Sequence, residues 1–109
     1  MHRIDELTKV ARDVALAYKQ SNTFKGRQPW SIDQYMAGFV GDVGDLSKLV
    51  MAKAGYREAD GVDERIAHEL ADCLWSILII ADELGVDLAA VYRQNMGTLL
   101  RQIMAERDH

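Results

Sequence analysis

Apolar side chains recur along the chain at intervals of three and four residues, the spacing that gathers them on one face of a helix. In the first segment Ile4, Leu7, Ala11 and Val14 follow this spacing, which predicts an amphipathic helix that ends near Gln20. No segment alternates apolar and polar residues as a half-buried strand does, and no internal repeat is visible. The pattern therefore predicts helices only.

Helix-end signals divide the rest of the chain into three further helices. Ser31 with Gln34 resembles a capping box, which opens a second helix that runs to about Gly55. A third helix is expected at residues 63–84, and Asp87 can cap the start of a fourth.

The third predicted helix has an unusual surface. From Cys73 to Ala81 it is apolar nearly all round, which is typical of a helix buried by its neighbours or by another subunit. We therefore predict an all-α fold for residues 1–109 as a single domain. The expected protomer resembles a four-helix bundle with a central apolar helix and associates as a dimer or tetramer.

Composition narrows the class of protein. The chain has 109 residues, a net charge of −4 and one cysteine. An acidic balance argues against a general nucleic-acid surface, and a lone cysteine permits no internal disulfide, which fits a reducing compartment. The longest apolar run, "CLWSILIIA", is short against the roughly 20 residues of a membrane helix, and "MHRIDELTKV" lacks the apolar core of a signal peptide. These features predict a soluble, cytoplasmic protein with neither nucleic acid nor membrane as a partner.

Two pairs of acids occur at a spacing of three residues. Asp42 and Asp45 lie on one face of the second predicted helix, and Glu69 and Asp72 lie on one face of the third. Such pairs are most often part of a solvated surface. Like charges at this spacing repel by a few tenths of a kcal/mol, a cost that water tolerates easily.

The surroundings of these acids favour a site over a plain surface. Gly38 and Gly41 fall on the side of the two aspartates, although each glycine costs about 1 kcal/mol relative to alanine within a helix. Close helix packing explains the glycines, and so does a ligand in the gap. Two carboxylate pairs that face each other across a groove require divalent cations, and an all-oxygen ligand set suits Mg²⁺ or Mn²⁺.

The spacing of the two pairs resembles a known motif. Asp42-x-x-Asp45, 23 further residues and Glu69-x-x-Asp72 resemble the metal-binding motif of the MazG-like nucleotide pyrophosphohydrolases, members of the all-α NTP pyrophosphohydrolase superfamily. The segment "HELADCLWSILIIADELGVDL" is similar to the second motif helix of that family, and the resemblance covers residues 30–101. The family pattern begins E-x-x-E, so both acids of the first motif are here one methylene shorter.

The resemblance implies an enzyme that cleaves a nucleoside triphosphate between the α and β phosphates, releasing a monophosphate and pyrophosphate. It implies Mg²⁺ or Mn²⁺ as cofactor, with Asp42, Asp45, Glu69 and Asp72 as metal ligands and catalytic residues, and a role in nucleotide-pool house-cleaning. Two alternatives stay open. The first alternative is a phosphoribosyl-ATP pyrophosphohydrolase. The second is a non-catalytic helical dimerisation or regulatory module with a degenerate site.

The sequence also offers candidate substrate-binding residues, although such residues often have a purely structural role. Lys48, one turn after the first acid pair, is the cation best placed for a polyphosphate, although surface lysines are usually only solvated. Trp30 suits base stacking or packing onto the second helix. Asn95 interrupts the apolar stripe of the fourth helix, where a buried asparagine can fix helix register. The resemblance implies instead that Asn95 and Arg101 contact the nucleotide. His68 is expected to point away from the face of Glu69 and to be structural.

Overall fold

The computed structural model describes residues 3–108 and contains four helices within them, with no strand. The helices are α1 (Ile4–Phe24), α2 (Ile32–Lys53), α3 (Val62–Glu83) and α4 (Leu88–Arg107). The predictions of an all-α fold and of four helices are confirmed.

The helix ends carry the predicted caps. The backbone N–H of Ser31 donates to the side chain of Gln34 at 2.8 Å, which completes this half of the capping box at the start of α2. Asp87 accepts a hydrogen bond from the backbone N–H of Ala90 at 3.3 Å and caps α4. Gly85 follows α3 with φ of +69°, a left-handed conformation that ends a helix cleanly.

The first helix is four residues longer than predicted. Polar residues after Gln20 predicted a break, but α1 continues to Phe24, and Thr23 donates its hydroxyl to the carbonyl of Lys19 at 2.9 Å. Serine and asparagine reduce helix propensity by well under about 1 kcal/mol each, which is too little to stop a helix. The chain turns instead at Gly26, where φ is +73°.

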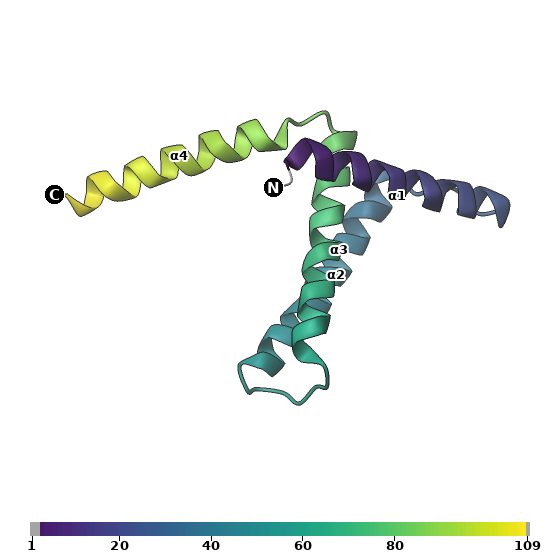
Figure 1. Cartoon of the computed structure of the whole chain (residues 1–109), viewed down its shortest axis with the longest axis horizontal. Coiled ribbons are helices and arrows are strands. Elements are labelled where there is room, and N and C mark those ends of the chain that lie inside the picture. The colour runs from purple at the N-terminus through teal and green to yellow at the C-terminus, as the bar shows by residue number, and fades with distance from the viewer. Residues whose placement is uncertain (1–2, 109) are drawn as a thin grey trace.

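The four helices make an open T-shaped protomer (Figure 1). α2 and α3 run side by side in opposite directions and form the stem. α1 crosses α3 at one end of this stem, and α4 leaves the same end in the opposite direction from α1. The α2–α3 loop lies at the far end of the stem, away from α1 and α4.

The core is small and lies where α1 crosses α3. Ala11, Leu78 and Ile79 are each 3% exposed and form its centre. The indole N–H of Trp75 donates to the backbone carbonyl of Ala11 at 3.1 Å, which ties α3 to α1. Half-buried residues that pack around this centre include Leu7, Tyr35 and Leu88.

The protomer is more extended than a globular chain of its length. Its radius of gyration is 17.6 Å, whereas a compact domain of this size has about 13 Å. α4 contains no buried residue, and Val91, Tyr92, Leu99 and Ile103 are 41–64% exposed. Beyond Leu88, the apolar stripe of α4 is therefore left uncovered within residues 3–108.

None of the helices within residues 3–108 combines the length and the apolar character that crossing a membrane requires.

Candidate functional site

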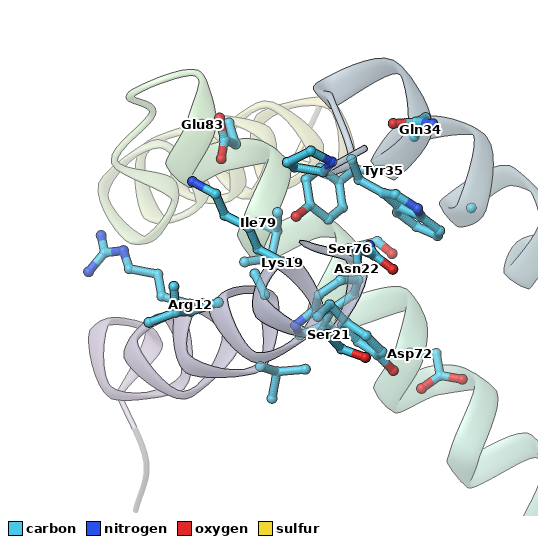
Figure 2. Close-up of a pocket in the computed structure, with 18 of the residues that line it drawn as sticks. Arg12, Lys19, Ser21, Asn22, Gln34, Tyr35, Asp72, Ser76, Ile79 and Glu83 are labelled. Atoms are coloured by element: carbon cyan, nitrogen blue, oxygen red, sulfur yellow. The ribbon is translucent and has the colours of Figure 1, made fainter. Parts of the chain in front are cut away.

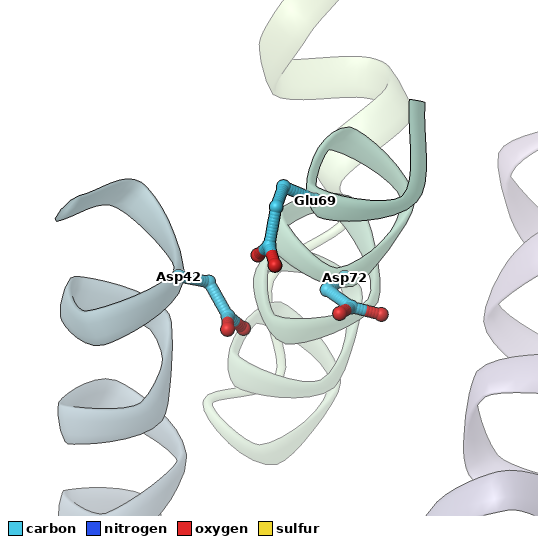
Figure 3. A group of neighbouring side chains, drawn as sticks. All are labelled: Asp42, Glu69 and Asp72. Carbon is cyan, nitrogen blue, oxygen red and sulfur yellow. The ribbon is translucent and has the colours of Figure 1, made fainter. Parts of the chain in front are cut away.

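Three carboxylates meet between α2 and α3. Asp42 on α2 and the pair Glu69 and Asp72 on α3 each place a carboxylate oxygen within 4.8 Å of the other two. Figure 3 shows Asp42 and Glu69 extending toward each other from the two helices, with Asp72 beside them. All three residues are half-buried. The structure thus brings together three of the four acids that the motif predicts.

Helix geometry explains this convergence. Glu69 and Asp72 are three residues apart, so they share one face of α3. α2 packs along that face in the opposite direction and supplies Asp42 from across the interface. The i, i+3 spacing therefore becomes a cluster only because the two helices pack side by side.

The cluster is electrostatically strained. Burial raises the pKa of Glu69, and the neighbouring carboxylates of Asp42, Asp72 and Asp45 raise this pKa further. Burial likewise raises the pKa of Asp42, with Asp72 and Asp45 adding to the effect. Both shifts mean that the surroundings disfavour the ionised form.

One oxygen of this cluster also lacks a partner. Oε2 of Glu69 is shut off from solvent and accepts no hydrogen bond from residues 3–108. Buried polar atoms are nearly always paired, so an orphaned carboxylate oxygen beside two other carboxylates calls for a cation. Three hard oxygen donors of this kind suit Mg²⁺ or Mn²⁺. The residues present fit such an ion.

Asp45 stands apart from the other three acids. It is exposed and lies outside the group whose oxygens approach within 4.8 Å. It is still near enough for its charge to raise the pKa values of Asp42 and Glu69. The equal roles predicted for the four acids therefore divide into a cluster of three and one outer carboxylate.

His68 touches this site, although the sequence suggested that it points away. Its Nε2 lies 3.3 Å from Oδ2 of Asp72, one helical turn further on. The i, i+4 spacing of the two residues was the signal for this contact. His68 can therefore orient the carboxylate of Asp72 from outside the cluster.

A large cavity opens on one side of the carboxylates, between α1 and the α2–α3 stem. Its volume is about 1150 Å³, and both Asp42 and Asp72 line it. Figure 2 shows Tyr35 and Ser76 in its wall with Asp72 at one edge. This cavity is called the aromatic cavity below, because Tyr18, Trp30, Tyr35 and Trp75 line it.

The aromatic rings in this wall form a continuous series of edge-to-face contacts. The ring centroids of Trp30 and Tyr35 are 5.7 Å apart, those of Tyr35 and Trp75 are 5.7 Å apart, and those of Tyr18 and Trp75 are 6.0 Å apart. Such pairs favour fixed ring orientations. Burial, with a smaller effect of Glu83, raises the pKa of Tyr35, so this phenol remains a hydrogen-bond donor.

The two glycines near the aspartates differ in what surrounds them. A Cβ at Gly38 would lie 3.5 Å from the ring of Trp30, an ordinary van der Waals contact, so the indole packs beside this glycine without requiring it. A Cβ at Gly41 would meet nothing within 4 Å, and Gly41 is exposed. Gly38 lines the aromatic cavity and Gly41 does not, and a Cβ would fit at both positions. The expectation that these glycines clear space for a ligand is therefore wrong for this structure.

A second cavity opens on the other side of the carboxylates, toward the α2–α3 loop. Its volume is about 430 Å³, and Asp45 and Glu69 line it. It is called the cationic cavity below, because Lys48, Arg57 and Arg65 share its wall. Lys48 was predicted from the sequence, whereas the two arginines were not. Arg57 lies in the α2–α3 loop, which no helical spacing relates to the motif. Arg65 lies on α3 one turn before Glu69, and this i, i+4 spacing was a signal that could have found it.

Asn95 and Arg101 lie away from these cavities. Both are exposed on α4, and neither lines the aromatic or the cationic cavity. Arg101 donates to the hydroxyl of Thr98 at 3.3 Å. At about 100° per residue the two positions are also roughly 120° apart around the helix. Within a single chain the structure does not bring them to the carboxylates.

In comparisons with known proteins, no protein-family model matches this chain, and no curated protein or solved structure matches it either. The resemblance to the MazG-like family therefore stays a prediction that rests on the spacing of the motif.

Proposed function

We propose that this chain is a metal-dependent nucleoside triphosphate pyrophosphohydrolase of the MazG-like type, which releases a nucleoside monophosphate and pyrophosphate. The observation that carries the proposal is the convergence of Asp42, Glu69 and Asp72, one of whose buried oxygens finds no hydrogen-bond partner among residues 3–108. Acids on a plain surface are solvated and need not converge. An aromatic cavity of sufficient volume for a nucleoside adjoins the cluster, which supports a nucleotide as the substrate.

In this proposal Asp42, Glu69 and Asp72 hold Mg²⁺ or Mn²⁺. When bound, such an ion neutralises phosphate charge and lowers the pKa of an attacking water. Asp45 lies just outside the cluster and is the carboxylate that we assign to orienting this water. Phosphoryl transfer needs little covalent chemistry from the protein, so positioned charges suffice.

The wall of the aromatic cavity supports a role in holding the base. Trp30 is 49% exposed, lies beside Gly38 and makes an edge-to-face contact with Tyr35. A ring that is both exposed and held in place offers a flat surface for stacking. Lys48 serves the phosphates from the opposite cavity.

The open protomer supports self-association as a homodimer or homotetramer. α3 leaves Leu74 and Ile77 40% and 39% exposed, and α4 has an uncovered apolar stripe. Asn95 and Arg101 keep a substrate role only if α4 of one copy reaches the site of another. The same surfaces favour the alternative of a non-catalytic dimerisation module. A cytoplasmic location belongs to the proposal, since Cys73 is a free, buried thiol.

The test is product analysis across a panel of NTPs, dNTPs and phosphoribosyl-ATP, with and without Mg²⁺ or Mn²⁺. We expect a monophosphate and pyrophosphate in equal amounts and only with metal. Preference for phosphoribosyl-ATP would select the alternative substrate. Release of free phosphate and a diphosphate would refute the proposed cleavage, and absence of any cleavage would favour the dimerisation module.

A further inference from the structure

The three clustered carboxylates stand at the junction of two cavities. Asp42 and Asp72 line the aromatic cavity, whereas Glu69 lines the cationic cavity together with Asp45. Because the three oxygens lie within 4.8 Å of one another, a group bound at the cluster faces both cavities at once.

The two cavities offer different chemistry. Aromatic rings line the larger one and are absent from the residues that line the smaller one. Lysines and arginines occur in both: the aromatic cavity has Arg12, Lys19, Lys25 and Arg27, and the cationic cavity has Lys48, Arg57 and Arg65. Aromatic character therefore separates the cavities, and positive charge alone does not.

The cations of the smaller cavity are available for a ligand. Among residues 3–108, neither Lys48 nor Arg57 forms an ion pair, and Arg65 makes only a 3.4 Å contact with the carbonyl of Asp60. Lys53, one turn beyond, is instead bound to Asp63 at 2.7 Å and does not line the cavity. Guanidinium groups carry five donors in a fixed fork that suits phosphate oxygens.

The two ends of a nucleoside triphosphate differ in chemistry in the same way as the two cavities do. In a nucleoside triphosphate the bond between the α and β phosphates separates the nucleoside from the two terminal phosphates. If that bond lies at the carboxylates, the nucleoside and the terminal phosphates must extend in opposite directions. The nucleoside then requires the aromatic side, and the terminal phosphates are left with the side of Arg57 and Arg65.

We infer that the cationic cavity is the subsite for the β and γ phosphates, and so for the pyrophosphate product, with Lys48, Arg57 and Arg65 as its anion ligands. This inference rests on the proposed function for the position of the cleaved bond. Asp45, Glu58 and Glu69 balance the three cations in the wall. Pyrophosphate therefore binds here only when a divalent metal offsets the acids.

The test is calorimetric binding of inorganic pyrophosphate in the presence of Mg²⁺. We expect binding by the wild type with Mg²⁺, none without it, and a loss of tenfold or more in affinity for Arg57→Ala and Arg65→Ala. Arg57→Lys should lose less because it keeps the charge. Lys53→Ala is the matched control: it removes a cation at the same end of the stem but outside the cavity, and should bind as the wild type does.

The reverse experiment uses a nucleoside monophosphate as the ligand. Trp30→Ala should weaken its binding, while Arg57→Ala and Arg65→Ala should leave it within about twofold. Far-ultraviolet circular dichroism identifies any variant that fails to fold, and exposed Lys48→Gln then replaces it.

Two results would overturn the inference. One is wild-type protein that does not bind magnesium pyrophosphate. The other is loss of that binding in Lys25→Ala or Arg27→Ala with no change in the two arginine variants, which would put the phosphates in the aromatic cavity. Hydrolysis with unaltered pyrophosphate binding in the arginine variants would reject only this subsite. Pyrophosphate binding without hydrolysis of any nucleotide would reject only the proposed function.

Discussion

The α2–α3 stem and α4 are built from helices of nearly equal length, 22, 22 and 20 residues, yet they have opposite surroundings. Each stem helix has the other as a partner along its length, which buries Leu49 and Cys73 and gathers the carboxylates. α4 meets the rest of the chain near its start, at Leu88, and then extends into solvent. Apolar periodicity is present in both regions and is sufficient to predict a helix in each. Which residues a helix buries depends on whether a second helix packs against it.

The comparison extends to charge. In the stem, packing concentrates acids until burial and mutual repulsion raise the pKa values of Asp42 and Glu69. In α4 no titratable side chain is buried. Carboxylates with raised pKa values therefore occur where two helices enclose the acids, which is why we assign the proposed function to the stem.

The largest expected effect is on catalysis in the stem. Glu69→Gln or Asp72→Asn should lower turnover by two orders of magnitude or more, equivalent to about 3 kcal/mol of transition-state stabilisation. KM should change less, because the lost charge matters most as phosphate charge redistributes. Steady-state pyrophosphate release measures both constants.

Glu64→Gln provides the matched control for this experiment. It makes the same chemical change on an exposed residue of the same helix, outside both cavities. Full activity in Glu69→Gln and Asp72→Asn, or an equal loss in Glu64→Gln, would remove the basis for calling the cluster catalytic.

The second prediction concerns the uncovered stripe of α4. Leu99→Glu should weaken the proposed self-association by about a hundredfold, since it places a charge where apolar side chains would meet a second copy. Multi-angle light scattering should show the wild type as a multiple of 12.3 kDa and the variant shifted toward 12.3 kDa. Gln94→Glu, which adds the same charge on the opposite side of α4, should leave the mass unchanged. A wild type that is monomeric at micromolar concentration would contradict the proposed association.

The contrast between stem and α4 also separates what the sequence could predict from what it could not. Local signals are sufficient for the four helices and for the caps at Ser31 and Asp87, but not for the end of α1, which continues past the predicted break to Phe24. The spacing of the acids was sufficient to predict that Glu69 and Asp72 share a face. The separation of Asp45 from the cluster and the position of Arg57 depend on how two helices and a loop pack, which no local pattern specifies. The same holds for α4, whose stripe indicates an apolar contact without indicating which chain makes it.

The third prediction uses pH to test the strain in the cluster. The folded-state pKa values of Asp42 and Glu69 are raised, so the folded protein binds protons more tightly than the unfolded chain. The stability that proton binding by Asp42 and Glu69 contributes is fully present below the ordinary carboxyl pKa of about 4. It is lost as the pH rises through the raised pKa values of the folded state. The metal-free protein should therefore melt at a higher temperature at about pH 5 than at pH 7.

Three comparisons sharpen this prediction. Glu69→Gln should flatten the pH response and stabilise the metal-free protein at pH 7. Millimolar Mg²⁺ should raise the melting temperature of the wild type at pH 7 by several degrees, through binding to the folded state alone. The ion pair with Arg12 lowers the pKa of Asp82, so this pair stabilises the fold until the pH falls through that lowered pKa. Its loss therefore reduces stability only in acid stronger than about pH 4, below both pH values of the comparison. A melting temperature indifferent to both pH and Mg²⁺ would argue that the carboxylates do not converge.

The smallest expected effect compares one glycine from each region. Gly41 in α2 and Gly97 in α4 both lie within helices, where alanine is favoured by about 0.5–1 kcal/mol. A Cβ at Gly41 would meet nothing within 4 Å, and one at Gly97 would lie 3.5 Å from the flexible end of Arg101, so neither change causes a clash.

Gly41→Ala should raise the free energy of unfolding, measured in urea, by most of this difference of about 0.5–1 kcal/mol between glycine and alanine, because α2 unfolds together with the core. In dilute protein, Gly97→Ala should raise the free energy of unfolding by less, because α4 contacts the core only near Leu88. At protein concentrations where a second copy would cover α4, the gain should approach that of Gly41→Ala. Equal gains at all protein concentrations would mean that α4 is as firmly coupled to the core as the stem, and would end the distinction between them.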